Sequence, residues 1–242
     1  MKQNNSENKR VVAIMQPYFL PYIGYFQLIN AVDEFIIYDN IEYTKKGWIN
    51  RNRILANGEA QFITLTVKKD SDYLNVNERY LAGTWGKDKN KILNKIINSY
   101  RKAPHFDAVK PLIEEIINYD DDNLFNFIFN SIEKICDYLD IENQLIRSSK
   151  LDYNNSLKSQ DKVIDICEVV AANVYCNPIG GVELYDKEAF SEKNITLHFL
   201  ESEIKTYKQF KNEFLPALSI LDVLMFNDKI VVKDWLKNYR LI

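Results

Sequence analysis

The sequence predicts an α/β fold, in which a mostly parallel sheet forms a Rossmann-like core that carries a helical insertion or subdomain. Three observations lead to this fold class. Apolar, β-branched runs occur near both ends of the chain, amphipathic helices fill its middle, and no linker rich in Pro, Gly or Ser separates two domains. We therefore expect a flexible N-terminus over 1–9 and a single α/β domain over 10–242, with a helical subdomain at about 87–142.

The first elements form a strand–helix–strand unit. Residues 10–15 (RVVAIM) and 34–38 (EFIIY) are almost entirely apolar, which is typical of strands buried on both faces. Apolar residues at helical spacing over 24–32 join the two strands, and a parallel right-handed crossover is the expected topology. An Asn-Gly pair farther along predicts a hairpin between 51–56 and 61–67.

The rest of the chain is first helical and then mixed. Apolar residues at helical spacing dominate the middle, whereas short apolar runs return in the last hundred residues. Strands at both ends and helices between them indicate one sheet into which the helical middle is inserted. We expect helices over 89–100, 107–119, 122–140 and 160–172, and strands over 143–148, 174–176 and 195–200.

Composition excludes several classes of function. The net charge of -3 gives no general attraction for nucleic acid. The three cysteines form no paired motif, and no long apolar span is present, so we expect a cytoplasmic protein without a membrane span. The two histidines, His105 and His198, stand apart from each other and from the cysteines, so we expect no metal site.

The first candidate binding segment leaves the first strand and enters the first helix. It runs from Gln16 through Tyr18 to Gly24, and the helix that follows offers free backbone N–H groups to an anion. Gly24 would allow a ligand or a strand to approach closely. The alternative is an aromatic-packed turn without a ligand.

The second candidate segment follows the second strand. Asp39 would bind sugar hydroxyls or accept a proton, and Trp48 would stack on a base or a sugar ring. Residues 50–53 alternate Asn and Arg. If they form an extended segment, the two Arg guanidiniums lie on one face, where they suit a diphosphate, and the two Asn amides lie on the other face. The alternative is a solvated hairpin with Arg–carboxylate pairs. The four alternating residues are Asn50, Arg51, Asn52 and Arg53.

The third candidate segment, NPIGGVELYDK, follows the strand over 174–176. Its two glycines allow backbone N–H groups to turn toward a ligand, and its side chains add acid, base and hydroxyl groups. Because parallel strands place their carboxyl ends on one edge, we expect this segment to lie close to the Gln16 loop. The alternative is a plain turn before a helix. The candidate residues are Asn177, Gly180, Gly181, Glu183, Tyr185, Asp186 and Lys187.

A set of strings along the chain resembles the WbqC-like family. The strings are MQPYFLPYIGYFQLI, DNIEYTKKGWINRNRI, YRKAPHF, NPIGGVELYDKEAF and LSILDVLMFN, in an order and spacing similar to that family from about Val11 to Asn227. The resemblance implies an association with gene clusters for O-antigen or capsule. Many members have His where this chain has Met15, so a role for that His is not carried over.

Two functional hypotheses follow. The first is a group-transfer enzyme acting on a nucleotide-linked sugar, with acyl or aminoacyl transfer to an amino sugar favoured. Arg51 and Arg53 would bind phosphate, Trp48 would stack, and Asp39 or Glu183 would act as the base. The second is a non-catalytic nucleotide-sugar-binding or scaffold protein, because no nucleophile is recognisable. The sequence predicts neither the donor, a cofactor, nor the oligomeric state.

Overall fold

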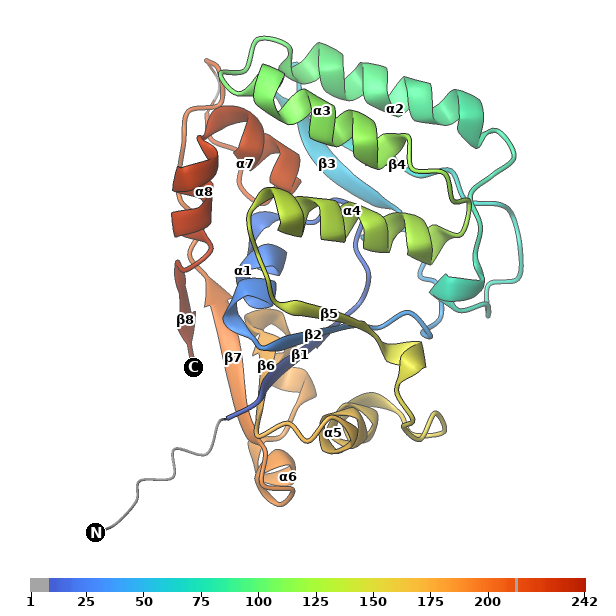
Figure 1. The fold of residues 1–242 in the computed structure, drawn as a ribbon, viewed down its shortest axis with the longest axis vertical. Helices are drawn as coiled ribbons and strands as arrows, with labels where there is room; N and C mark the ends of the chain where they lie inside the picture. The colour runs from blue at the N-terminus through green and yellow to red at the C-terminus, as the bar shows by residue number, and fades with distance from the viewer. Residues whose placement is uncertain (1–8, 212) are drawn as a thin grey trace.

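The computed structural model describes residues 9–211 and 213–242, which form one six-stranded sheet with helices on both faces (Figure 1). The strand order is β5-β2-β1-β6-β7-β8. The first five strands run parallel and β8 pairs antiparallel with β7, so the predicted fold class is confirmed. The strands are β1 (Val11–Met15), β2 (Glu34–Ile37), β5 (Gln144–Arg147), β6 (Val174–Pro178), β7 (Thr196–Ser202) and β8 (Tyr239–Leu241).

Strand β1 lies inside the sheet because its VVAIM sequence is apolar on both faces. Val12 is in register with Glu34 of β2 on one side and with Tyr175 of β6 on the other. The chain runs from β1 outward through β2 to β5, and then crosses to β6 on the opposite side of β1. The strand order therefore reverses between β1 and β6, which is where open α/β sheets bind ligands.

Helices cover each face of the sheet, and alternate residues of β1 point into two different cores (Figure 1). Ala13 belongs to the larger core, which contains side chains of α1 and α4. Val12 and Ile14 belong to the smaller core, which contains side chains of α5 and α6. These helices are α1 (Ile23–Ala31), α4 (Leu124–Tyr138), α5 (Ser159–Val169) and α6 (Lys187–Ser191).

The predicted hairpin is confirmed, although its second strand begins earlier than expected. Asn57 and Gly58 have φ values of 56° and 82°, so they form a two-residue turn that pairs Ala56 with Glu59. The hairpin lies under α2 and α3 (Figure 1). No helix of the described residues is long and apolar enough to cross a membrane. The elements are β3 (Arg51–Ala56), β4 (Glu59–Thr64), α2 (Trp85–Tyr100) and α3 (Phe106–Ile117).

The C-terminal segment adds three short elements that the sequence did not predict. Helices α7 (Ile220–Phe226) and α8 (Lys229–Trp235) have seven residues each, and β8 completes the sheet edge. Short helices give weak periodic signals, and tertiary packing supplies most of their stability. The side chain of Ser219 accepts a hydrogen bond from the backbone N–H of Leu221 and caps α7, whose residues are mostly buried.

A buried carboxylate, Asp222 of α7, holds this segment against the rest of the protein. The Tyr100 hydroxyl of α2 donates to Oδ2 at 2.8 Å, and the Tyr207 hydroxyl donates to Oδ1 at 2.7 Å. Gln209 Nε2 donates to the same Oδ1 at 2.6 Å. Burial raises the pKa of the Asp222 carboxyl above its ordinary value, and these three donors oppose the rise. The carboxylate thus joins three separate segments of the chain.

We predict that Tyr207→Phe lowers the free energy of unfolding by about 1–3 kcal/mol, because it leaves a buried carboxylate without one donor. Denaturant unfolding at neutral pH measures the change. Tyr73→Phe is the matched control, since Tyr73 is 83% exposed, and it should change stability very little. Equal stability of the two variants would contradict a stabilising role for the hydrogen bond to Asp222.

Candidate functional site

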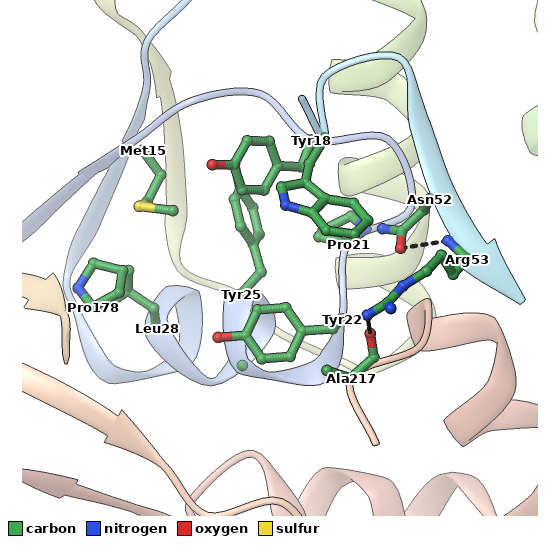
Figure 2. Close-up of a pocket in the computed structure, with 12 residues that line it drawn as sticks. Met15, Tyr18, Pro21, Tyr22, Tyr25, Leu28, Asn52, Arg53, Pro178 and Ala217 are labelled. Carbon is green, nitrogen blue, oxygen red and sulfur yellow. Dashed lines mark hydrogen bonds between the residues drawn. The ribbon is translucent and has the colours of Figure 1, made fainter. Parts of the chain in front are cut away.

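A cavity of about 310 Å³ opens at the point where the strand order reverses. Met15, the last residue of β1, and Pro178, the last residue of β6, both line it. The other walls come from the loop after β1, helix α1, strand β3 and the segment before α7 (Figure 2). We call it the switch-point cavity. Its lining residues are Met15, Tyr18, Pro21, Tyr22, Gly24, Tyr25, Leu28, Trp48, Asn52, Arg53, Pro178 and Ala217.

The loop after β1 is held in place by an amide from β3. Asn52 Nδ2 donates to the carbonyls of Phe19 at 3.1 Å and Leu20 at 2.8 Å. Leu20 has a φ of 44°, in the left-handed region that non-glycine residues seldom occupy, and Ser219 Oγ donates to the same carbonyl at 2.8 Å. Asn52 is itself buried, so this loop forms a fixed wall of the cavity.

Arg53 supplies the positive charge of the cavity. Its guanidinium lies 5.3 Å from the centroid of the Trp48 ring. Nη2 donates to the Ala217 carbonyl at 3.5 Å (Figure 2). Its Nε is buried and has no hydrogen-bond partner among the described residues. A guanidinium that lies over an indole ring and has unused N–H donors is suited to bind an anionic group, because the ring contact fixes the plane of the guanidinium.

Tyrosine hydroxyls supply most of the remaining polar groups. Burial, with a smaller contribution from neighbouring Tyr22, raises the pKa of Tyr18, and burial raises the pKa of Tyr25 well above its ordinary value. These two phenols therefore stay neutral at physiological pH and both donate and accept hydrogen bonds. Tyr25 donates to the carbonyl of Gln16 at 2.9 Å, whereas the Gln16 side chain is exposed and does not line the cavity.

Gly24 lets helix α1, the Tyr22 ring and strand β7 approach one another. A Cβ at this position would lie 2.4 Å from two atoms of the Tyr22 ring and 2.5 Å from Ser202 Oγ. Both separations are far below an ordinary carbon contact. A larger residue here would therefore displace the Tyr22 ring and the Ser202 hydroxyl, whereas the proposed contact of Gly24 with a ligand stays a prediction.

The two arginines predicted to bind one diphosphate, Arg51 and Arg53, lie in different surroundings. Arg51 Nε donates to the Gly47 carbonyl at 3.1 Å, and Nη2 donates to the carbonyl of Lys46. Its guanidinium lies 4.4 Å from the centroid of Phe62 and does not line the switch-point cavity. Asn50 Nδ2 donates to the Leu65 carbonyl at 2.9 Å. Arg53 can thus contact a ligand in this cavity, whereas Arg51 is bonded to the backbone of the loop that precedes β3.

Asp39 lies at a second site. It lines a hollow of about 450 Å³ at the carboxyl ends of β2 and β5, together with Arg147, Ser149 and Lys150, and we call this the polar hollow. Asp39 is 2% exposed, and its carboxylate accepts hydrogen bonds from two serines and an asparagine. The structure therefore separates Asp39 from Trp48, and its catalytic role stays a prediction.

Only the beginning of the third segment reaches the switch-point cavity, through Pro178. Asn177 is buried and accepts from the Tyr175 hydroxyl at 3.0 Å, and the helical turn η3 (Ile179–Leu184) follows. Gly180, Gly181 and Glu183 lie in this turn, of which Gly180 and Glu183 are exposed and Gly181 is buried.

The end of the third segment packs against the smaller core and begins α6. The Tyr185 ring lies 5.8 Å from that of Tyr175. Asp186 caps α6 by accepting from the N–H of Glu188 at 3.0 Å, and Lys187 Nζ lies 5.7 Å from the centroid of Phe199. Contacts of these residues with a ligand stay predictions.

Several cavity residues were not predicted. Pro21, Tyr22 and Tyr25 belong to the aromatic string PYFLPYIGYF, whose density of rings after a buried strand was the available signal. Ala217 has no such signal, because it reaches the cavity only through tertiary folding. Within residues 9–211 and 213–242, no group of His, Cys, Asp and Glu side chains could hold a metal ion.

Comparison with known proteins gives a family for this chain. Residues 16–233 match the WbqC-like protein family. The chain belongs to this family. The chain is also similar to the uncharacterized protein Rv1507c of Mycobacterium tuberculosis (strain ATCC 25618 / H37Rv), with 34% identity over 233 residues, which cover 95% of this chain and 98% of that protein. No solved structure matches the chain. The resemblance found in the sequence is confirmed, and its matched region includes every candidate site residue.

We predict that Gly24→Ala lowers the free energy of unfolding by about 1–3 kcal/mol, because the added methyl displaces the Tyr22 ring or strand β7. Gly86→Ala in α2 is the matched control, since a Cβ there meets nothing within 4 Å and should stabilise the helix by about 0.5–1 kcal/mol. Thermal and denaturant unfolding measure both changes. A Gly24→Ala protein as stable as the original would show that the close approach is not required.

Proposed function

We propose that the chain is a group-transfer enzyme that acts on a nucleotide-linked sugar in the biosynthesis of O-antigen, capsule or a related surface polysaccharide. Transfer of an acyl or aminoacyl group to an amino sugar is the favoured reaction. The observation that carries this proposal is the switch-point cavity, where aromatic rings and the Arg53 guanidinium line one space at the carboxyl ends of β1 and β6. Membership of the WbqC-like family supports the pathway.

The chemistry of the cavity suits the parts of such a ligand. Trp48, Tyr18 and Tyr22 offer ring faces for a base or a sugar, and neutral phenols offer hydrogen bonds to sugar hydroxyls. Arg53 offers forked donors to a phosphate. The volume of about 310 Å³ is at the lower end of the range for small-molecule sites, so the cavity would hold part of a nucleotide-linked sugar and leave the rest in solvent.

A cytoplasmic location belongs to the same proposal. The three cysteines, Cys136, Cys167 and Cys176, are all free and buried. Free thiols are the usual state of cysteine in a reducing compartment such as the cytoplasm. The state of the thiols therefore supports this location.

We predict that a nucleotide-linked sugar binds the switch-point cavity and that Arg53→Gln weakens the binding about tenfold or more, since a charge-assisted hydrogen bond contributes about 1.5–3 kcal/mol. Arg51→Gln is the matched control, because Arg51 lies on the same strand but outside the cavity. It should bind within about threefold of the original, as expected for a residue without ligand contact. Calorimetric titration of a panel of nucleotide-linked sugars measures both.

Three results would count against the cavity as the binding site. One is that no nucleotide-linked sugar binds at millimolar concentration. Another is that Arg51→Gln and Arg53→Gln lose affinity equally. The third is that Arg53→Gln unfolds at a lower temperature yet binds normally, which would make Arg53 structural.

A second candidate function is a non-catalytic nucleotide-sugar-binding or scaffold protein. One observation favours it: among the described residues that line the switch-point cavity there is no His, Cys, Asp or Glu to act as nucleophile or base. The candidate bases Asp39 and Glu183 lie outside the cavity lining. Catalysis would then require a base that reaches the cavity only when a ligand is bound, or one supplied by a partner.

The two functions predict different results in a turnover experiment. We expect mass spectrometry of an amino-sugar nucleotide incubated with the protein and a panel of acyl and aminoacyl donors to show a product with the added group. Asp39→Asn and Glu183→Gln, tested separately, should show which carboxylate the reaction needs. Saturable binding with no product from any donor would support the binding protein instead.

A further inference from the structure

The polar hollow differs in chemistry from the switch-point cavity and shares no lining residue with it. Its walls come from the ends of β2 and β5, the turn η2 (Ser148–Lys150), the first turn of α4 and the turn η1 (Val76–Glu78). It contains two cationic side chains, Arg147 and Lys150, and two carboxylates, Asp39 and Glu78. A ligand can use only those charges that have no partner within the protein.

Arg147 is held in a fixed orientation. Its guanidinium lies 4.5 Å from the centroid of Phe129 and 5.2 Å from that of Phe125, two rings on one face of α4. Nη1 donates to Oδ1 of Asn126 at 2.9 Å. A guanidinium fixed by two rings and an amide loses little further entropy when it binds an anion.

The cations of the hollow have no ion-pair partner within the described part of the chain. Neither Arg147 nor Lys150 lies within 4.0 Å of a carboxylate oxygen. The Arg147 guanidinium also acts on Glu133 of α4, because burial raises the pKa of that carboxyl and the guanidinium lowers it. Glu133 lines a different surface hollow. The guanidinium therefore keeps donors for a ligand.

The carboxylates of the hollow, in contrast, already accept hydrogen bonds from the protein. Asp39 Oδ1 accepts from Ser148 Oγ and from the Ser149 N–H, each at 2.8 Å. Its Oδ2 accepts from Ser149 Oγ at 2.5 Å and from Asn77 Nδ2 at 3.2 Å. Glu78 Oε2 accepts from a backbone N–H at 2.9 Å in a capping box. A carboxylate whose oxygens already accept these hydrogen bonds offers little to a second cation.

Helix α4 adds positive potential to the same place. Its fifteen residues begin at Leu124, and residues of its first turn line the hollow. The amino end of a helix of this length carries a partial positive charge. Two unpaired cations and a helix amino end therefore favour an anionic group.

We propose that the polar hollow is a binding site for the oxyanion group of a small ligand, either a carboxylate or a phosphate monoester, held by Arg147 and Lys150. The asparagine and serine side chains around it would contact hydroxyl groups on the same ligand. The proposed anion contacts are independent of the proposed nucleotide-sugar contacts, because Arg147 and Lys150 do not line the switch-point cavity.

Three sugars that differ in one group test the site. Glucuronate carries a carboxylate, glucose 1-phosphate carries a phosphate, and glucose carries neither. We expect at least one of the two anions to give saturable chemical-shift changes or calorimetric heat with the full chain, and glucose to give none. Binding of one anion identifies the group, and binding of both shows that the hollow accepts either.

Substitutions in and outside the polar hollow show where the anion binds. Lys150→Gln and Arg147→Lys should each weaken anion binding about fivefold or more, since the first loses a charge-assisted contact and the second loses the planar pair of guanidinium donors. Lys237→Gln, an exposed lysine elsewhere, and Arg53→Gln, in the switch-point cavity, should bind as the original does. Because Lys150 is exposed and Arg147→Lys keeps the charge, both variants should fold.

Three results would overturn the proposal. One is that neither anion binds at millimolar concentration. Another is that the anion binds equally well to Lys150→Gln, Arg147→Lys and the original. The third is that affinity falls in Arg53→Gln but not in the Arg147 variant, because the anion then occupies the switch-point cavity and the polar hollow is not a site. A failure here leaves the nucleotide-sugar proposal untouched, because its own test uses Arg53 and Arg51.

Discussion

Parallel pairing of β1 with β2 on one side and β6 on the other is the constraint on which the rest of the structure depends. It places the carboxyl ends of these strands on one edge, so the segments after Met15, Ile37 and Pro178 begin together. A strand paired on both sides must be apolar on both faces, which VVAIM satisfies. Both candidate sites lie at this edge.

The two sites differ because the segments after the strands differ. The loop after β1 carries rings and prolines, and its backbone carbonyls are bonded by Asn52, so it forms an aromatic wall with few polar groups. The segments after β2 and β5 carry Asp39 and serines, which saturate one another and leave the nearby cations unpaired. One edge thus offers a stacking site with one guanidinium and a separate site for an anion.

The sequence could predict what depends on periodicity and on local turn chemistry. The buried runs at β1 and β2, the helical spacing of α2 to α4 and the Asn57-Gly58 turn are local signals, and the structure confirms each. Which side chains share a cavity depends on tertiary folding. Alternation placed Arg51 and Arg53 on one face of β3, but it could not show that Arg51 bonds to its own loop at Gly47 while Arg53 reaches Trp48.

The C-terminal segment shows how a distant anchor can shape the cavity. Asp222 fixes α7 through Tyr100 and Tyr207, and the cap of α7, Ser219, lies three residues before it. The N–H of Ser219 donates to the Arg53 carbonyl, and its Oγ donates to the Leu20 carbonyl. A buried carboxylate outside the cavity is therefore linked, through one serine, to two of its walls. Because an ordered site needs support from the groups behind its lining residues, loosening α7 would disturb the cavity without touching a residue that lines it.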